Sequence, residues 1–263
     1  MSFIVLLTDF GHIDPYVGQM KGMIYKKFPE ARIVDLCHGV QPFNVEQAGF
    51  LLYASLDHFP HGSVFAAVVD PGVGSDRRIV LADTGAYLIL APDNGLLSPL
   101  FEEGRILRVY RYRGNVPASS TFHGRDIIAP LAAHLARNNK VPEEFSPTDP
   151  DELILTGLLR PRFSESGLVC RVVHQDSFGN LILELNIKDW GERLKNRKLR
   201  VKGLDLLPVN YYAAIPEGCL GLVPGSQGRL EIAAREKSAA ELLETGPGDS
   251  VIIRENSTAP LKR

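Results

Sequence analysis

The stretch AAVVDPGVGSDRR, residues 66–78, decides the expected fold. An apolar run, Val64 to Val69, stops at Asp70, and a glycine-rich turn and two arginines lead into a second apolar run. Ligands of α/β proteins bind at the carboxyl ends of buried strands. The turn can bring Asp70 and Arg77 to one site, or it can be a surface hairpin with a capping aspartate and solvated arginines. The surrounding sequence has to decide between these two interpretations.

The composition predicts a globular protein without an unusual charge. The chain has 263 residues, 44% hydrophobic and 23% charged, and a formal net charge of -2. We therefore expect one large domain or two small ones, and neither nucleic acid nor a membrane as partner. The three cysteines form no CxxC pair, which argues against a disulfide framework or a thiolate zinc site. The N-terminus lacks a basic region and no apolar run reaches the length of a membrane span, so we expect a cytoplasmic protein.

Apolar runs and helical segments alternate in the N-terminal part. The pattern predicts an α/β domain over residues 1–140 with a central, largely parallel sheet. The first run ends in Thr8-Asp9, which places a second carboxylate at a strand end, and Asp14 is expected to cap the first helix with Pro15 at its first position. The expected strands are 3–7, 32–36, 64–69, 79–83, 87–91 and 106–110, and the expected helices are 15–28, 45–56 and 127–136.

A histidine precedes the last of these helices. His123 lies in TFHGRD, residues 121–126, just before the expected helix N-terminus. The positive end of a helix dipole favours the neutral form of a nearby imidazole, and a neutral imidazole can accept a proton. A lone histidine before a helix is otherwise usually structural.

The composition changes after the last helix. Residues 141–166 are rich in proline and acidic residues and are expected to form a linker. Residues 167–263 show short β segments at 168–174, 180–185, 199–201, 220–223, 229–233 and 250–254, with one or two helical turns at 238–243. They predict a smaller all-β domain, barrel-like and antiparallel. Its DSFGN segment, 176–180, offers an anion, an aromatic ring and an amide close together.

Several kinds of chemistry remain possible for these residues. Hard or borderline metal ligands occur in the N-terminal part, but without HExxH or related spacings: Asp9, His12, Asp14, His38, Asp70 and His123. No GxSxG elbow indicates a serine nucleophile, and GVG is too short for a P-loop or a dinucleotide fingerprint.

Seven motifs spread over nearly the whole chain resemble one known family. The sequence is similar to the S-adenosyl-L-methionine (SAM) hydroxide adenosyltransferases, the adenosine-forming SAM hydrolases, which are related to the SAM-dependent fluorinase and chlorinase. The motifs are LLTDFG at 6–11, DPYVGQMKG at 14–22, VDPGVGSDRR at 69–78, APDNGLL at 91–97, TFHGRD at 121–126, DSFGN at 176–180 and GSQGRLEIA at 225–233.

The resemblance implies a site and an assembly. The catalytic Asp-Arg-His set maps onto Asp70, Arg77 and His123, and the ribose-binding aspartate maps onto Asp9. The other implied substrate-binding positions are Tyr16, Phe43, Asn94, Phe122, Asp176, Phe178, Asn180, Ser226 and Glu231. SAM is the implied substrate, with no cofactor and no metal. The implied assembly is a homotrimer with the substrate between subunits.

Two positions bear on the difference from the halogenases that the sequence resembles, and one of them is Gly124, where the halogenases have a halide-binding serine or a glycine. Asp70 stands where the fluorinase-like pattern has a tyrosine, and a carboxylate repels a halide. The expected reaction is therefore attack of water or hydroxide on the 5′-carbon of the SAM ribose, giving adenosine and L-methionine. Two alternatives stay open: a metal-dependent hydrolase built on the same carboxylates and histidines, and a non-catalytic sensor that binds SAM or adenosine.

Overall fold

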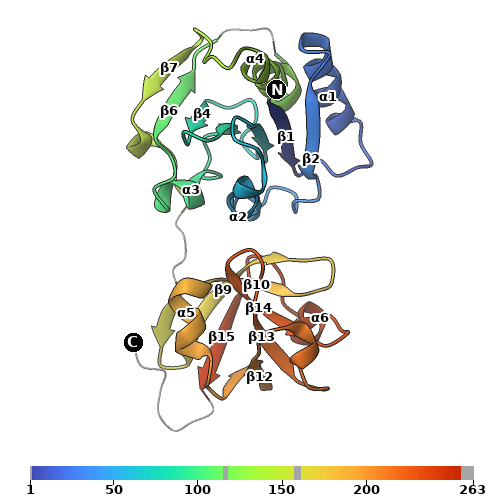
Figure 1. Ribbon diagram of the computed structural model, residues 1–263, viewed down its shortest axis with the longest axis vertical. Coiled ribbons are helices and arrows are strands. Elements are labelled where there is room, and N and C mark those ends of the chain that lie inside the picture. Colours follow the sequence, from blue (N-terminus) through green and yellow to red (C-terminus); the bar gives the residue numbers. More distant parts are fainter. Residues whose placement is uncertain (1, 115–117, 157–160, 256–263) are drawn as a thin grey trace. The chain divides into compact units, whose positions relative to one another are not determined.

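The computed structural model describes residues 2–114, 118–156 and 161–255 (Figure 1). The chain divides into two compact units, residues 1–157 and 158–263. The first is α/β and the second is all-β apart from short helices, as the sequence predicts.

A seven-stranded sheet forms the centre of the first unit. Its strand order is β2-β1-β3-β5-β4-β6-β7. The pairs β1–β2, β1–β3 and β3–β5 are parallel, whereas β4 is antiparallel to both its neighbours and β7 is antiparallel to β6. The carboxyl ends of β2, β1, β3 and β5 therefore lie at one edge of the sheet. The strands are β1 (Phe3–Thr8), β2 (Arg32–Cys37), β3 (Val64–Val68), β4 (Ile79–Asp83), β5 (Leu88–Pro92), β6 (Arg108–Tyr112) and β7 (Phe145–Thr148).

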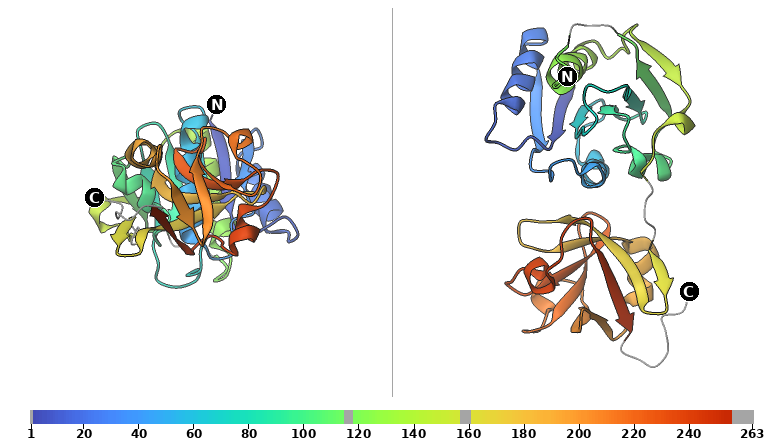
Figure 2. Two further views of the ribbon diagram at one scale, coloured as in Figure 1. Left: turned by 90° about the horizontal axis from the view of Figure 1, so that it is seen from below. Right: turned by 180° about the vertical axis from the view of Figure 1, so that it is seen from behind.

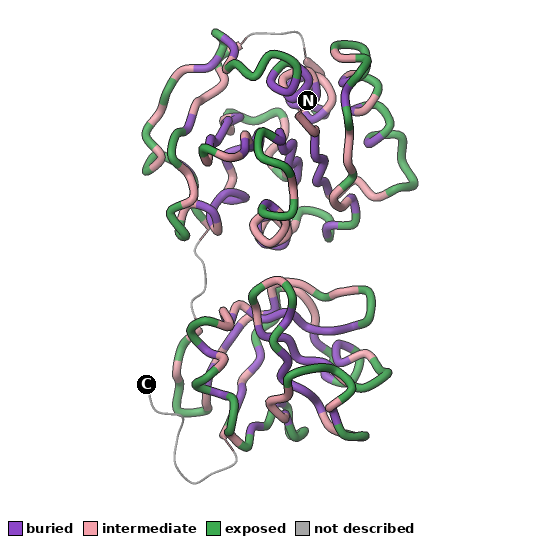
Figure 3. Tube along the Cα trace, in the orientation of Figure 1, coloured by how far each residue is buried: buried purple, intermediate pink, exposed green. Residues whose placement is uncertain are grey.

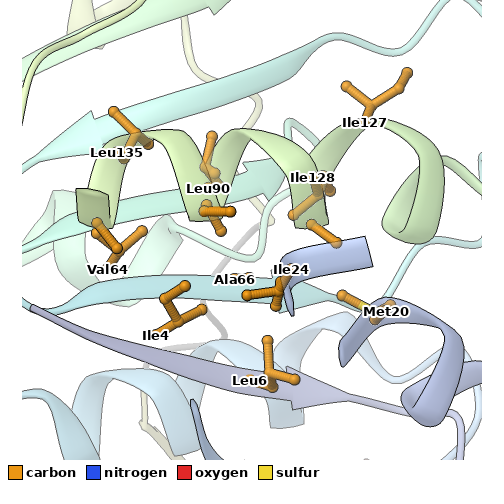
Figure 4. Packing of buried hydrophobic residues seen from close by; sticks show 14 of the residues in the cluster. Ile4, Leu6, Met20, Ile24, Val64, Ala66, Leu90, Ile127, Ile128 and Leu135 are labelled. Carbon is orange, nitrogen blue, oxygen red and sulfur yellow. The ribbon is translucent and has the colours of Figure 1, made fainter. Parts of the chain in front are cut away.

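Helices cover both faces of this sheet, which explains why its central strands are continuously apolar. Side chains alternate along β1, so Ile4 and Leu6 pack with α1 (Tyr16–Lys27) and α4 (Ala129–Asn138) (Figure 4). Val5 and Leu7 pack on the opposite face, with α2 and α3. The remaining helices of this unit are α2 (Val45–Ser55), α3 (Ser98–Glu102), η1 (Leu56–His58), η2 (Gly124–Ile128) and η3 (Pro150–Glu152).

Two helix starts differ from the sequence prediction. Pro15, not Asp14, occupies the N-cap position of α1, and no side chain caps this helix. The segment Gly124–Ile128 forms a π-helical turn that runs directly into α4, so the helix begins earlier than residue 127. Such turns are rare and occur frequently at functional sites. His123 is the N-cap residue of the π turn.

The second unit is a closed β-barrel (Figure 2). The strand order β10-β14-β13-β12-β11-β15-β9 closes through the β9–β10 pair, and β8 extends the sheet beside β9. Only β12–β13 among these pairs is parallel. Closure leaves no exposed edge in the ring, and its interior strand residues are buried (Figure 3). The elements are β8 (Arg162–Ser164), β9 (Gly167–Gln175), β10 (Leu181–Asn186), α5 (Ile187–Leu194), β11 (Leu199–Val201), β12 (Leu204–Pro208), η4 (Tyr212–Ala214), β13 (Leu220–Pro224), β14 (Arg229–Ala234), α6 (Ala239–Leu243) and β15 (Ser250–Glu255).

The segment expected to be a linker, residues 141–166, contains strands at both ends. β7 lies within it and pairs with β6, and β8 lies within it and pairs with β9. The β7 sequence FSPT looks unlike a strand because of Pro147, but β7 is the last strand of its sheet, where a missing N–H is tolerated. The division between the units falls after residue 157. No helix in the described ranges is long and apolar enough to cross a membrane.

Replacement of a barrel core residue gives the first prediction. Leu183 is fully buried in the cluster that holds Trp190, the only tryptophan of the sequence. Leu183→Ala removes buried methyl groups and should lower the free energy of unfolding by about 2–5 kcal/mol. Urea unfolding followed by Trp190 fluorescence measures this. Leu242→Ala, on a half-exposed side chain, is the matched control and should stay within about 0.5 kcal/mol of the parent. Equal midpoints for both variants would contradict the barrel core described above.

Candidate active site

The carboxyl edge of the first sheet brings together side chains that are distant in the sequence. Asp9 follows β1, Asp70 follows β3 and Asn94 follows β5. His123 joins them from the π turn before α4. This is the edge at which open α/β sheets bind their ligands.

Arg77 links two of the predicted catalytic residues. Its Nε donates a hydrogen bond to Asp70 Oδ1 at 2.7 Å, and its Nη2 donates to Asp70 Oδ2. The same Nη2 lies 3.0 Å from His123 Nδ1. The side chains of Asp70 and Arg77 are 6% and 8% exposed, so Arg77 is not a solvated surface residue. Of the two interpretations of residues 66–78, the structure supports the one that brings Asp70 and Arg77 together.

The glycine-rich turn explains how Arg77 folds back. Val73 donates its N–H to the Asp70 carbonyl at 3.2 Å. Gly74 has φ +83° and lies against the Ser120 carbonyl, where a Cβ atom would overlap the oxygen. Only glycine fits this position, because residues with a side chain rarely adopt this φ and because a Cβ atom has no space here. The turn thus packs against the segment that leads to His123.

The contact with Arg77 determines which nitrogen of the neutral His123 ring carries the proton. Arginine only donates hydrogen bonds, so His123 Nδ1 must accept, and the neutral ring then carries its proton on Nε2. Burial lowers the pKa of His123, and the positive charge of Arg77 lowers it further, against the smaller opposing effects of Asp70 and Asp126. His123 is therefore neutral near pH 7, as the helix-dipole argument predicts.

The Asp9 carboxylate is bound by a backbone N–H from another loop. Its Oδ2 accepts the Phe43 N–H at 2.9 Å, and Phe43 reaches it from the loop between β2 and α2 with φ +68°. The Phe43 side chain itself is 71% exposed. Burial raises the pKa of Asp9, the Phe43 N–H opposes this, and the negative charge of Asp70 adds to the rise. Asp9 and Asp70 are therefore electrostatically coupled carboxylates at one edge.

An aromatic cluster flanks these groups. The rings of Phe10, Tyr16 and Phe122 meet edge to face with centroids 5.2 to 5.7 Å apart. The Arg125 guanidinium lies 4.9 Å from the centre of the Phe122 ring. Two predicted substrate residues, Tyr16 and Phe122, thus share one cluster, although Tyr16 is half exposed and Phe122 is buried. Phe10 follows Asp9 and Phe122 precedes His123 in the chain, so this aromatic wall borders the candidate catalytic residues.

The Asn94 side chain forms hydrogen bonds with the backbone at this edge of the sheet. Its Nδ2 donates to the Val69 carbonyl at 2.9 Å, next to Asp70, and its Oδ1 accepts the Leu96 N–H at 3.3 Å. The side chain thereby fixes the end of β3 to the end of β5. Its expected contact with substrate stays a prediction.

The predicted residues of the second unit line one cavity of about 820 Å³. The DSFGN turn forms part of its wall. Asp176 Oδ1 accepts the N–H groups of Phe178 and Asn180 at 3.0 and 2.8 Å, and its Oδ2 accepts Asn180 Nδ2 at 2.8 Å. The Phe178 ring is 79% exposed beside the cavity. The cavity is lined by His174, Asp176, Phe178, Asn180, Ile182, Tyr212, Ser226, Gln227, Glu231, Ala234, Glu236, Lys237 and Ser238.

Sequence reasoning missed Tyr212 in this wall. Its hydroxyl donates to Glu231 Oε2 at 2.7 Å, and Glu231 is 5% exposed. Burial raises the pKa of Glu231, as does the charge of Asp176, while the Tyr212 hydrogen bond opposes the rise. Gly225 leaves the space that the Glu231 carboxylate occupies. Two exposed tyrosines in a row, Tyr211 and Tyr212, were the available signal for this surface.

Three of the six candidate metal ligands form hydrogen bonds with other side chains. Asp70 and His123 contact Arg77, and His38 contacts Asp35 and Thr8. Over the described ranges, no group of three or more His, Cys, Asp or Glu side chains is placed to hold a metal ion.

Comparison with known proteins covers both units. The family model of the SAM hydroxide adenosyltransferase N-terminal domain matches residues 4–145, and that of the C-terminal domain matches residues 170–252. A Thermus thermophilus protein named (R)-S-adenosyl-L-methionine hydrolase is 36% identical over 92% of this chain and 96% of its own length. A Salinispora tropica protein of the same name is 32% identical over 95% and 97%.

A more distant relative and a solved structure are also similar to this chain. A fluorinase from Actinopolyspora mzabensis is 27% identical over 68% of this chain and 69% of its own length. The crystal structure of a conserved, uncharacterised protein from Thermotoga maritima superposes with a TM-score of 0.85 at 31% identity, covering 95% of this chain and 99% of the other. With both of its units matched in order, the chain belongs to the SAM hydroxide adenosyltransferase family.

Proposed function

We propose that this chain hydrolyses SAM to adenosine and L-methionine by attack of water on the ribose 5′-carbon. The observation that carries the proposal is the buried contact of Arg77 with both Asp70 and His123. The names of the relatives support the same substrate and add that its configuration is (R). Because L already describes the α-carbon, (R) refers to the sulfonium centre. The proposed substrate is the (R) epimer at sulfur.

The chemistry of the substrate defines what the site has to supply. The C5′–S bond breaks with its electron pair moving to sulfur, so methionine leaves as a neutral thioether and needs no general acid. A new O–C5′ bond forms, and one proton of the water must be removed. The sulfonium charge disappears in the reaction, so a water-excluding pocket favours the transition state over the charged ground state. The aromatic wall of Phe10, Tyr16 and Phe122 supports such exclusion.

The hydrogen-bond directions indicate a different role for each of the three proposed catalytic residues. His123 Nδ1 is occupied by Arg77, so its Nε2–H can only donate, and it orients the water through the oxygen. Asp70 keeps a second lone pair on each carboxylate oxygen beyond those that Arg77 uses, and accepts the proton. Arg77 holds the carboxylate in place and stabilises the developing hydroxide. A carboxylate here disfavours halide as a nucleophile.

The remaining predicted residues hold the substrate. Asp9 Oδ1 is not used by the Phe43 N–H and is assigned to the ribose hydroxyls. Asp176, Asn180, Ser226 and Glu231, together with the Phe178 ring, are assigned to the adenine and methionine ends, and Tyr212 positions Glu231. The homotrimer implied by the resemblance stays a prediction, and sedimentation of a species three times the 29.0 kDa chain mass would support it.

Product analysis in labelled water tests the proposal. The protein is treated with EDTA and incubated with (R)- or (S)-SAM in chloride-free buffer containing H₂¹⁸O. We expect adenosine and methionine, faster from the (R) epimer, with ¹⁸O in the 5′-hydroxyl of adenosine. Loss of activity with EDTA would favour a metal-dependent hydrolase instead. Intact SAM that stays bound would favour a sensor. Methylthioadenosine with ¹⁸O-labelled homoserine would contradict attack at C5′, because these products form when water attacks the γ-carbon of the methionine part.

Isosteric carboxamide variants separate turnover from binding. Asp70→Asn removes the proton acceptor and should lower kcat by about 10²–10⁴-fold with little change in KM. Asp9→Asn weakens charge-assisted bonds to the ribose and should raise KM by about tenfold or more. Steady-state kinetics with (R)-SAM measure both. Asp205→Asn, in an exposed ion pair, is the control and should match the parent. A rise in KM alone for Asp70→Asn would contradict the assignment.

The state of His123 predicts the acid side of the pH profile. Since burial and Arg77 lower its pKa from the usual 6.5, the ring stays neutral above that pH, and kcat should be constant there. Below it, kcat should fall as the pH passes through the lowered pKa, because a protonated ring no longer accepts from Arg77. As the pH falls, the unfolded chain binds this proton at a higher pH than the folded protein does. Neutral His123 therefore contributes fully to the free energy of unfolding above about pH 6.5, and this contribution is lost as the pH falls through the lowered pKa.

A non-titrating variant is the control for that profile. The amide of His123→Gln can accept from Arg77 and donate to water, so it should retain part of kcat. Its acid limb should move to lower pH, because the amide does not titrate. An unchanged limb in His123→Gln, or a limb above pH 6.5 in the parent, would show that another group titrates.

A further inference from the structure

A continuous chain of hydrogen bonds runs behind the Asp9 loop. Lys21 Nζ donates to Asp35 Oδ2 at 2.6 Å, and Asp35 Oδ1 lies 2.9 Å from His38 Nε2. His38 Nδ1 lies 2.8 Å from Thr8 Oγ1, which also accepts the Phe10 N–H at 3.2 Å. The chain starts at two half-exposed side chains and ends at two buried ones, since His38 and Thr8 are 1% and 0% exposed.

The partners at the two ends give these bonds one consistent direction. The ionised Asp35 carboxylate only accepts hydrogen bonds, from Lys21 at one oxygen and from His38 Nε2–H at the other. The neutral His38 ring therefore accepts at Nδ1, and the Thr8 hydroxyl donates to it while Thr8 Oγ1 accepts the Phe10 N–H. Burial alone would raise the pKa of Asp35, but the His38 and Lys21 bonds outweigh it, so this pKa is lowered and the carboxylate is ionised.

The hydrogen-bonded relay of Lys21, Asp35, His38 and Thr8 binds the loop that contains Asp9 and the loop that contacts it. On the Asp9 side, it binds the Phe10 N–H through Thr8, and the Gly11 N–H donates to the His38 carbonyl at 2.7 Å. On the other side, His38 begins the loop that carries Phe43, the donor to the Asp9 carboxylate. Asp9 therefore lies between two loops that are joined to each other through Thr8 and His38.

Fold stability alone does not explain buried polar groups at this place. The neighbouring positions of β1 are apolar and packed, and apolar side chains at Thr8 and His38 would avoid the cost of burying a hydroxyl and an imidazole. The Thr8 hydroxyl instead binds the Phe10 N–H, which an apolar side chain at this position could not do. A site residue held by loops gains from such support, because small displacements cost binding.

We propose that Thr8 and His38, supported by Asp35 and Lys21, are positioning residues that set Asp9 for the ribose of the substrate. The inference rests on the proposed function, because it takes Asp9 as the ribose ligand. The relay does not touch the reacting atoms. Its loss therefore weakens binding of any ligand that carries the ribose, including the product adenosine, and leaves the chemical step largely intact.

Substitutions at Thr8 test the relay without removing a charge. Thr8→Val keeps the shape of the side chain and removes the hydroxyl, whereas Thr8→Ser keeps the hydroxyl. Loss of one buried hydrogen bond corresponds to about five- to tenfold in an equilibrium constant. We expect Thr8→Val to raise the adenosine dissociation constant, measured by calorimetry, and the KM for (R)-SAM by about that factor, with kcat within about twofold. Thr8→Ser should bind within about twofold of the parent.

Two further variants keep the test decisive if Thr8→Val does not fold. Asp35→Asn changes a half-exposed end of the relay and should raise the same two constants by a smaller factor. Asp57→Asn, in an exposed pair with Arg105 in the same unit, is the control and should change neither. Unchanged adenosine binding in Thr8→Val and Asp35→Asn, equal losses in Thr8→Val and Thr8→Ser, or a fall in kcat alone would overturn the relay. A parent protein that neither binds adenosine nor hydrolyses SAM would instead overturn the proposed function.

Discussion

The buried ion pair between Arg77 and Asp70 is the interaction on which the rest of the site depends. Removing two charges from water costs several kcal/mol for each ion, and a buried pair recovers this only with good geometry. The two parallel hydrogen bonds of Arg77 supply that geometry, and its third contact fixes the tautomer of His123. The pair therefore adds little to stability by itself. Its effect is to hold a carboxylate and an imidazole in one defined arrangement.

The sequence predicts most of the architecture because the architecture depends on local patterns. Continuous apolar runs identified β1, β3 and the β4–β5 hairpin, and short alternating segments identified most barrel strands. The patterns failed where tertiary position outweighs composition. Pro147 made β7 look like linker, although an edge strand tolerates proline, and the amphipathic helix α5 was hidden among short β segments.

The site residues were predicted by resemblance, and the sequence could not show their contacts. Arg77 and His123 are 46 positions apart, and they meet in the fold where Gly74 packs against Ser120. Tyr212 in η4 and Glu231 in β14 are likewise 19 positions apart, and only the folded barrel brings them into contact. The relay behind Asp9 was also outside the reach of motif reasoning, because Thr8, Asp35 and His38 each look like ordinary strand-end residues.

The charges at the sheet edge suit a substrate that loses charge as it reacts. Burial is the main cause of the raised pKa of Asp9, and the negative charge of Asp70 adds to the rise. Two carboxylates at one edge attract a cationic substrate, because opposite charges attract strongly in a partly dehydrated site. In the proposed reaction the sulfonium becomes a neutral thioether and Asp70 takes up a proton, so this attraction ends. The two carboxylates thus favour the cationic substrate over its neutral products.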